Sequence, residues 1–350
     1  MTTSRLPRLS RRALLSAGGA LGAGALLAAC GSDDSSGSSG GSGSGSGSGG
    51  GFSFTDDRGE KVELDAIPER IVAFVGTAAA LHDYGVECVG VFGPTKQANG
   101  EPDVQAGDLD VDSLTSLGSA WGEFNVEAYA QLNPQLLISN MFEADTLWYV
   151  PEESADDILG LAKSIGIQVA PTVDPDVTLD SIIARYTELA GALGADLSAG
   201  PVTQAKTQYE QAAEALRQAA RDNAGIKVLA CSADADLFYV SNPAASADLA
   251  AFKQLGVDLI VPENLDEGGF YESLSWENAG RYPADVLLLD SRSSALQPAD
   301  LSGKPTWAQL PAVVADQVTP WNSEPRYSHA GCAPVLQQLA DALSAARKVS

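Results

Sequence analysis

Histidine is scarce in this sequence, because only His82 and His329 occur among 350 residues. Zinc and manganese sites usually need three or four imidazole and carboxylate ligands in one place. Catalytic motifs are also missing: we find no H-E-x-x-H, no phosphate loop, and no G-x-S-x-G elbow between an expected strand and helix. Direct zinc or manganese capture and an exported enzyme are therefore the weaker alternatives. His329 and Cys332 lie close in sequence, but no group to orient a thiol nucleophile can be identified.

Basic residues are also few, with 21 Lys and Arg against 46 Asp and Glu and a formal net charge of −25. Nucleic acids and anionic lipid surfaces are bound through clusters of Lys and Arg. The charge balance therefore excludes a nucleic-acid partner and adhesion to a membrane through a basic patch.

Long apolar runs are absent beyond the first residues, so no later segment reaches the length of a membrane span. The chain begins with Arg5, Arg8, Arg11 and Arg12 and continues from Ala13 with a short apolar stretch. This pattern is typical of an export signal, which we place at 1–29. Ser10-Arg11-Arg12 with Leu14 resembles a twin-arginine signal, although the choice between the twin-arginine and general secretory routes stays open.

The segment 27–30, Leu-Ala-Ala-Cys, resembles a lipobox, in which Cys30 is acylated and becomes the mature N-terminus. A plain secretory signal cleaved nearby is the alternative. The following residues are almost all Gly and Ser, so we expect 30–51 to be a flexible tether with a reach of roughly 25 Å. The expected location is the outer face of the cytoplasmic membrane, with the lipid as anchor.

The remaining chain alternates between predicted strands and helices, which indicates an α/β fold with largely parallel sheets. The segment "FSFTDDRGEKVEL" predicts a hairpin with Gly59 in its turn. We predict a helix over 154–165 that Gly166 ends, a strand over 167–170, and a final helix over 333–348. Apolar residues spaced by three and four predict a long helix over 197–223. The resulting stripe consists of Val202, Ala205, Tyr209, Ala212, Leu216 and Ala219.

One short sequence unit occurs twice in the chain. "FNVEAYAQLNPQLLISN" and "LSWENAGRYPADVLLLD" each contain a glutamate near the start of a predicted helix, then a turn with proline, then a buried strand. Gln135 follows Glu127 at the same spacing as Asp285 follows Glu277. The proline positions differ, because Pro283 stands one place early relative to Pro134. The repetition predicts two α/β lobes that each present one glutamate at a helix start.

The ordered set of these segments resembles the ferric-siderophore and cobalamin type of solute-binding lipoproteins that serve ABC importers. The resemblance lies in "TDDRG" before "PERIVAF", the unit with Glu127, the long helix, and a second α/β lobe. Gln135 departs from it, since the family usually has Asp there. The resemblance implies a class III solute-binding protein with two Rossmann-like lobes joined by a long rigid interlobe helix. We place the lobes at 52–195 and 225–350, and the helix at 196–224.

The resemblance also implies partners and roles. In this family, one surface glutamate on each lobe docks into an arginine pocket on a permease subunit, and Glu127 and Glu277 stand at the matching places. A carboxylate in the first turn of a helix is favoured by the helix dipole and can pair with a guanidinium. The alternative is that each glutamate is only a favourable N-terminal charge. We expect a monomer without a cofactor, whose ligand is an iron(III)-siderophore complex.

Ligands of open α/β lobes bind beyond the carboxyl ends of the strands, where this sequence places aromatic and basic loop residues. The predicted ligand-binding residues are Trp121, Phe142, Trp148, Tyr149, Tyr271, Arg292, Trp321, Arg326 and Tyr327. The loops expected at the cleft carry few cations, namely Lys96, Arg281, Arg292 and Arg326. The same loops carry many carboxylates, namely Glu143, Asp145, Glu152, Glu153, Asp266, Glu267 and Glu272. An acidic rim repels a ferric tris-catecholate, so a neutral or cationic ferric hydroxamate is predicted, with cobalamin and haem as alternatives.

Three cysteines follow Cys30 in a chain that we expect to be exported. Because three is not an even number, they cannot all be paired in disulfides with one another. Cys88 lies beside a predicted strand of the first lobe and is expected to be a buried apolar residue. Cys231 and Cys332 both belong to the second lobe. They are therefore the one pair for which the sequence suggests a disulfide, and whether it forms stays open.

Overall fold

The first lobe of the computed structural model is built around a parallel sheet with the strand order β5-β4-β3-β6-β7. The structure describes residues 51–350. The expected signal peptide at 1–29, the lipidation site at Cys30 and the tether at 30–51 therefore lie outside the described residues, except for Gly51. The five strands are β3 (Ile71–Phe74), β4 (Gly90–Phe92), β5 (Thr115–Ser116), β6 (Leu136–Met141) and β7 (Lys163–Gln168).

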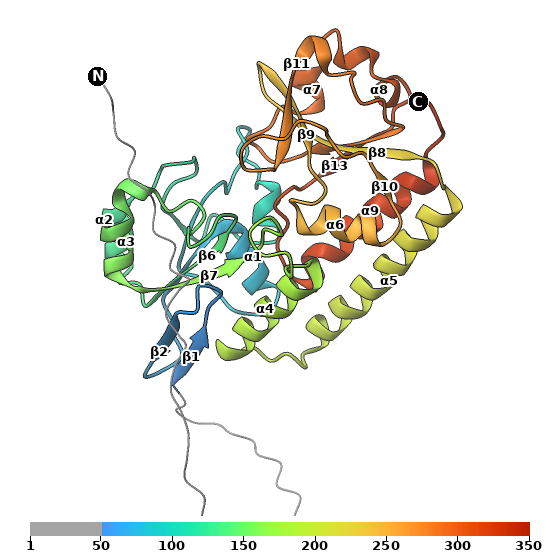
Figure 1. The fold of residues 1–350 in the computed structure, drawn as a ribbon. Coiled ribbons are helices and arrows are strands. Elements are labelled where there is room, and N and C mark those ends of the chain that lie inside the picture. Colours follow the sequence, from blue (N-terminus) through green and yellow to red (C-terminus); the bar gives the residue numbers. More distant parts are fainter. Residues whose placement is uncertain (1–50) are drawn as a thin grey trace, which may run out of the picture. The chain divides into compact units, whose positions relative to one another are not determined.

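Helices cover both faces of this sheet. Figure 1 shows α2 (Val126–Gln131) and α3 (Ala155–Leu161) on one side of β6 and β7. On the other side lie α1 (Val75–His82) and α4 (Leu179–Ala192). All four residues of β3 are buried, as expected for a strand of a parallel sheet that is covered on both faces.

The hairpin of β1 (Phe52–Thr55) and β2 (Lys61–Leu64) is confirmed, with Gly59 at φ 82° in its turn. The carboxylate of Asp56 ties the turn to the first lobe. Its Oδ1 accepts the backbone N–H groups of Arg58 and Glu60 at 3.0 Å each, and its Oδ2 accepts the N–H of Gly166 at 2.9 Å. The hairpin is therefore bonded directly to β7.

The same contact corrects one prediction. Gly166 does not end a helix over 154–165. It lies inside β7, paired with Ser139 of β6, and α3 ends at Leu161. A Cβ at Gly166 would stand 2.5 Å from Met141 Sδ, so the glycine permits close packing in the sheet. The hydrogen-bonded pairing of β7 with β6, which is distant in sequence, overrides a local sequence pattern that suggested a helix.

The second lobe contains a six-stranded mixed sheet with the order β11-β9-β8-β12-β13, and β10 pairs with β8. Strands β8, β10, β12 and β13 are parallel, whereas β9 and β11 are antiparallel additions at one edge. The six strands are β8 (Lys227–Ala233), β9 (Leu237–Ser241), β10 (Asp258–Leu259), β11 (Tyr271–Ser275), β12 (Val286–Asp290) and β13 (Val318–Trp321).

Alternating side chains of β8 enter two separate cores, as the pleat of a strand requires. Val228 and Ala230 pack with α5 (Gly200–Asp222), α6 (Ala247–Gln254) and α9 (His329–Ala345). Leu229 and Cys231 pack on the other face with α7 (Pro298–Leu301) and α8 (Pro311–Val314). Sequence analysis missed α7, α8, β5, β11 and β13, which are short elements stabilised by tertiary contacts.

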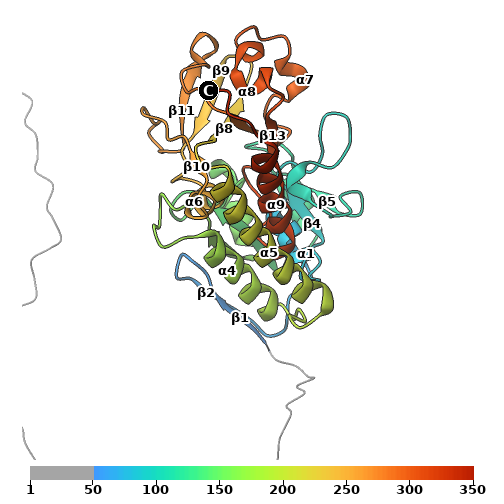
Figure 2. The same cartoon turned by 90° about the vertical axis from the view of Figure 1, so that its right-hand side faces the viewer.

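The predicted long helix is confirmed as α5, and it contacts the cores of both lobes. Val202 near its start packs against the first core, Tyr209 against both, and Leu216 lies in the second-lobe core. Its partner α9, which runs beside it in Figures 1 and 2, does the same, since Cys332 lies in the first core and Leu336 in the second. Two packed helices therefore join the lobes.

The last helix begins earlier than predicted. It starts at His329 instead of 333, because Ser328 caps it by accepting the N–H of Gly331 at 2.8 Å. Pro334 lies inside the helix. The helix ends at Ala345, and the chain then extends so that the N–H groups of Val349 and Ser350 bond to Asp285 Oδ1.

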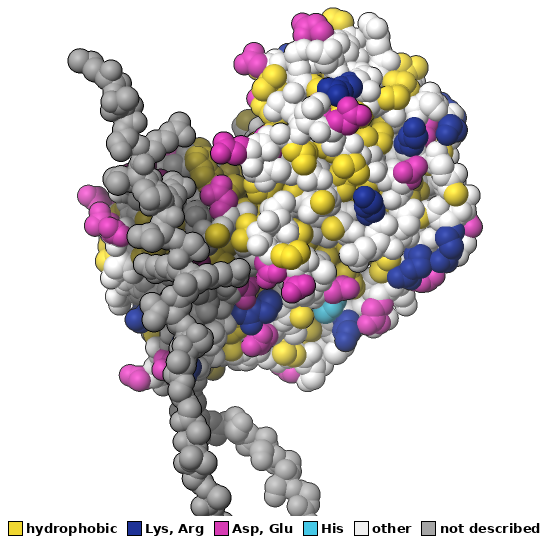
Figure 3. Space-filling model, in the orientation of Figure 1, with side chains coloured by type: hydrophobic (Ala, Val, Ile, Leu, Met, Phe, Trp, Pro, Cys, Tyr) yellow, Lys and Arg dark blue, Asp and Glu magenta, His cyan; other side chains and the backbone are white. Residues whose placement is uncertain are grey.

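The described residues belong to one compact unit, Gly49–Ser350. Among residues 51–350, none of the helices has both the length and the apolar composition needed to cross a membrane. Acidic and basic side chains are interspersed on the face of these residues that Figure 3 shows.

Candidate ligand-binding site

A pocket of about 470 Å³ lies between residues of the two lobes, at the carboxyl ends of several strands. Its lining includes Ala233 at the end of β8, Asp290 at the end of β12 and Trp321 at the end of β13. The first lobe contributes Phe142, which directly follows β6, and Trp148 from the same loop. This is the position in which open α/β folds bind ligands.

Aromatic side chains form much of the pocket wall. They are Phe142, Trp148, Tyr239, Phe270, Tyr271 and Trp321. The rings of Phe142 and Trp148 lie 4.7 Å apart, and those of Tyr239 and Tyr271 lie 5.1 Å apart. Aromatic walls with a few converging polar groups suit a bulky ligand that is apolar in part and polar in part.

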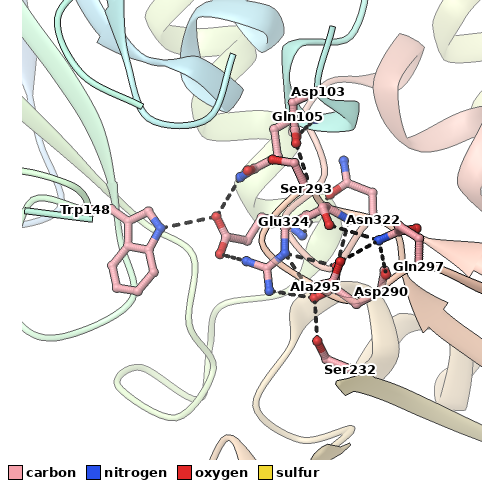
Figure 4. Close-up of polar contacts among 11 residues, drawn as sticks. Asp103, Gln105, Trp148, Ser232, Asp290, Ser293, Ala295, Gln297, Asn322 and Glu324 are labelled. Carbon is pink, nitrogen blue, oxygen red and sulfur yellow. Dashed lines mark hydrogen bonds and ion pairs between the residues drawn. The ribbon is translucent and has the colours of Figure 1, made fainter. Parts of the chain in front are cut away.

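The pocket contains a buried charge cluster centred on Arg292. Its Nη2 bonds to Asp290 Oδ2 at 2.7 Å, its Nε bonds to Asp290 Oδ1 at 3.1 Å, and its Nη1 bonds to Glu324 Oε1 (Figure 4). Asp290 is fully buried and Glu324 is 7% exposed. One guanidinium is thus held between two carboxylates.

Glu324 also connects the lobes. Its Oε2 accepts Nε2 of Gln105 at 2.8 Å and Nε1 of Trp148 at 3.2 Å, and both donors belong to the first lobe (Figure 4). A third contact crosses nearby, where the N–H of Ser293 donates to Asp103 Oδ2 at 2.9 Å. The polar groups of this buried region are therefore paired across the junction of the lobes.

Burial and charge act in opposite directions on this cluster. Burial alone would lower the pKa of Arg292, but the Glu324 and Asp290 carboxylates raise it, so the guanidinium stays charged. Burial raises the pKa of Glu324, and this effect exceeds the lowering by Arg292. Each charged group of the cluster has a bonded partner, which offsets part of the cost of burying it.

The structure brings some of the predicted ligand-binding residues to the pocket. Phe142, Trp148, Tyr271, Arg292 and Trp321 all line it. Trp321 is only 3% exposed and belongs mainly to the core of the second lobe, where its Nε1 donates to Asp248 Oδ2 at 2.7 Å.

Trp121 and Tyr149 lie beside the pocket and not in its lining. Trp121 packs on Trp148 at 4.6 Å and on Tyr149 at 5.1 Å, and it is 61% exposed. Both line a neighbouring cavity of about 560 Å³. Tyr149 has φ 62°, a left-handed conformation that is uncommon for a bulky residue and that the surrounding aromatic rings maintain.

Arg326 and Tyr327 point away from the pocket. Arg326 pairs with Asp83 at 3.2 Å and Asp108 at 2.9 Å, so it stabilises the packing between segments distant in sequence. Tyr327 is 3% exposed and stacks on Tyr186 in the first core. The sequence places both in a loop before a helix, but the early start of α9 turns them inward.

Sequence analysis did not identify Asp290, Glu324 and Asp234 as pocket residues. The rule that ligands lie beyond strand ends would have found Asp290, the last residue of the strand "VLLLD". Several charged residues expected near the cleft serve other contacts instead. Arg281 bonds to Glu263 and to the buried Glu272, and Lys96 pairs with Asp112.

The repeated units occupy equivalent places in the two lobes. Gln135 Oε1 accepts the N–H of Arg70 just before β3, and Asp285 Oδ2 accepts the N–H of Lys227 at the start of β8. The backbone N–H of each returns to the carbonyl of the same partner at 2.9 Å. An amide therefore replaces a carboxylate at Gln135 without loss of the contact.

Both repeated glutamates are exposed in the structure. Glu127 lies in the first turn of α2, whose cap is Asn125. Glu277 lies in a single 3-10 turn, η3 (Trp276–Asn278), and not in an α-helix. The second helix start expected from the repeat is thus reduced to one turn, because Tyr282 and Pro283 follow closely and lead the chain into β12.

The three described cysteines, Cys88, Cys231 and Cys332, are free and buried. Cys231 belongs to β8 and packs in the same core as α7, whereas Cys332 packs with the first core. The suggested Cys231–Cys332 disulfide is therefore not formed. Within residues 51–350, no group of three His, Cys, Asp or Glu side chains is arranged to hold a metal ion.

Comparisons with known proteins agree with this architecture. A model of the periplasmic binding protein family matches residues 78–325. The structure of DesE, a ferric-siderophore receptor protein from Streptomyces coelicolor, is 51% identical, with a TM-score of 0.82 over 85% of this chain and 100% of that chain.

More distant structures share the fold. The siderophore periplasmic binding protein from the fuscachelin gene cluster of Thermobifida fusca is 23% identical, with a TM-score of 0.56 over 79% of this chain and 97% of that chain. SirA of Staphylococcus aureus, solved with staphyloferrin B, is 19% identical, with a TM-score of 0.56 over 84% of this chain and 99% of that chain. No curated protein sequence matches significantly. Because the family model covers most of the folded chain, this protein belongs to the periplasmic binding protein family.

Proposed function

We propose that this protein is the extracytoplasmic receptor of an ABC importer for iron(III)-siderophore complexes, with a preference for hydroxamates. The observation that best supports this proposal is the composition of the pocket. Its wall is aromatic, and its charged residues are Glu143, Asp234, Asp290, Arg292 and Glu324. Four carboxylates against one guanidinium disfavour a trianionic ferric catecholate and tolerate a neutral or cationic ferric hydroxamate. The similarity to the ferric-siderophore receptor DesE supports the ligand class.

The ligand contacts in this proposal follow the pocket and revise the prediction from sequence. Phe142, Trp148 and Tyr271 pack on the carbon skeleton of the chelate, and Trp321 contributes one edge of the wall. Three of the five N–H groups of Arg292 are used by the two carboxylates, so two remain to donate to hydroxamate oxygens. Trp121 and Tyr149 support Trp148 from outside.

Titration of the ligand-free protein with a panel of ferric complexes tests this function. Intrinsic tryptophan fluorescence follows binding, because Trp148 lies in the lining. The panel contains a ferric trihydroxamate, a ferric tris-catecholate, haem and cobalamin. We expect the trihydroxamate to bind tightest. Tightest binding of the catecholate would refute the hydroxamate preference, and tightest binding of haem or cobalamin would refute the siderophore function.

The cellular context forms a second part of the proposal. Export by the segment 1–29, acylation of Cys30 and the tether at 30–51 would hold a monomeric receptor at the outer face of the cytoplasmic membrane. The lobes at 52–195 and 225–350, joined by the helix at 196–224, would each present one glutamate to a permease subunit. Replacing Cys30 with alanine tests the anchor. We expect the variant in the soluble fraction, and membrane retention equal to that of the wild type would contradict it.

A further inference from the structure

Arg292 is the only Lys or Arg that lines the pocket within the described part of the chain. A lone guanidinium at the base of a binding pocket ordinarily attracts anions, through charge and through paired N–H groups. Here its charge is opposed by two carboxylates in direct contact, Asp290 and Glu324. With both carboxylates ionised, the guanidinium and the two carboxylates together carry one net negative charge.

The two carboxylates differ in what fixes them. Asp290 is the last residue of β12 and also accepts a hydrogen bond from the hydroxyl of Ser232 at 3.1 Å, so its position is set within the second lobe. Glu324 lies in the loop between β13 and α9 and is held from the opposite lobe by Gln105 and Trp148 (Figure 4). Both N–H donors bond to Oε2, which leaves Oε1 facing Arg292.

We propose that Glu324 is a specificity-determining residue, which sets the charge preference of the pocket by neutralising Arg292 together with Asp290. This inference rests on the proposed function, since it assumes that the pocket takes a ferric chelate. Arg292 then serves as a hydrogen-bond donor without a net positive field around it. The pocket then accepts neutral and cationic complexes, whereas anionic complexes are repelled by the excess negative charge of the two carboxylates over the one guanidinium.

The test uses the isosteric variant Glu324→Gln and two ferric chelates built on one tripodal backbone. One backbone carries three hydroxamates and is neutral, whereas the other carries three catecholates and has three negative charges. We expect the ratio of catecholate to hydroxamate affinity to rise by at least about tenfold, because removal of one nearby charge shifts the binding of a trianion most. Isothermal titration of the folded protein measures both affinities.

Glu143→Gln is the matched control. Glu143 lines the same pocket, is exposed, and forms no ion pair with another residue of 51–350. This variant therefore changes the pocket charge equally without uncovering Arg292. A smaller rise in the ratio than for Glu324→Gln supports the inference. An equal rise would show a general field effect and overturn it. The double variant Glu324→Gln with Arg292→Gln should lose the gained affinity for the catecholate, and retention of it would also overturn the inference.

A second variant keeps the inference testable if Glu324→Gln does not fold. Asp290→Asn removes the other carboxylate that pairs with Arg292 and should raise the same ratio of affinities. An unchanged ratio would count against the inference.

Failure of the inference is distinct from failure of the proposed function. If wild-type protein binds neither chelate nor a linear ferric trihydroxamate, the function is wrong. If it binds the hydroxamate and Glu324→Gln leaves the ratio unchanged, only the inference is wrong.

Discussion

The indole N–H of Trp148 donates to Glu324 Oε2 at 3.2 Å, joining a loop of the first lobe to a loop of the second. The same ring lines the pocket and packs against Phe142 and Trp121. Trp148 therefore both lines the pocket and forms a hydrogen bond between the two lobes. Substitutions that remove the hydrogen bond alone, or the hydrogen bond and the ring together, distinguish these two roles.

Trp148→Phe keeps an aromatic ring but removes the hydrogen bond, and Trp148→Ala removes both. We expect the affinity for a ferric trihydroxamate to fall by a few-fold for Phe and by about thirtyfold for Ala, the size of a central aromatic contact. Isothermal titration measures both. Trp276→Phe, outside the pocket lining, serves as control. Wild-type affinity in Trp148→Ala would rule out this ring as a ligand contact.

Glu127 and Glu277 are exposed and lie outside the pocket lining. We expect Glu127→Gln and Glu277→Gln to leave ligand affinity unchanged and to reduce uptake, with the double variant reduced by at least about tenfold. The reason is that the proposed docking depends on a charge-assisted pair between each glutamate and the permease. Uptake of radioactive iron as its siderophore complex by whole cells measures the effect. Glu210→Gln, an exposed carboxylate of α5, is the control. Normal transport by the double variant would disprove docking through these residues.

We expect Asp248 to make the free energy of unfolding depend on pH. Burial raises its pKa to about 6, although the hydrogen bond from Trp321 lowers it in part. Because the folded state keeps this proton up to about pH 6 and the unfolded state releases it near pH 4, the free energy of unfolding falls as pH rises through this window. The loss is about 3 kcal/mol and is complete above pH 6.

Asp248→Asn removes this titration and still offers an acceptor to Trp321. Relative to the wild type, the variant should gain about 3 kcal/mol between pH 4 and pH 7, as measured by urea unfolding at each pH. Other titrating groups are shared by both proteins and cancel in the difference. A difference that stays constant with pH would show that Asp248 does not titrate in this range.

The free cysteines lead to a chemical prediction. Burial raises the pKa of Cys88 to about 12 and raises the pKa of Cys231 and Cys332 as well, so little thiolate forms at neutral pH. We expect iodoacetamide to leave all three unmodified in the native protein and to modify all three in guanidinium without reductant. Peptide mass spectrometry identifies the sites. If Cys231 and Cys332 react only after reduction, they are disulfide-bonded after all.

Helices α5 and α9 both pack on the cores of the two lobes. Continuous helices offer no loop hinge to absorb large backbone rotations, so ligand binding should produce only a small closure. Small-angle X-ray scattering of the chain lacking 1–51 should give the same radius of gyration with and without ligand, within error. A clear decrease on binding would show a wide domain movement.

The sequence by itself determined the α/β class, the hairpin with Gly59, the long helix and the repeated unit. These features have local causes: a turn glycine, an apolar stripe at helical spacing and buried strands bounded by turns. The stripe from Val202 to Ala219 needs no long-range information, because side chains three and four residues apart share one face of any α-helix.

Only the tertiary structure decided which loop residues reach the pocket. Arg326 and Trp321 were both predicted from the sequence to contact the ligand. In the structure, Arg326 pairs with Asp83 and Asp108, whereas Trp321 lines the pocket. Glu324 gains its place from Gln105, Trp148 and Arg292, which come from three distant segments. A loop side chain has no periodic pattern, and its direction is set by whichever charged or buried partner the fold brings within bonding distance.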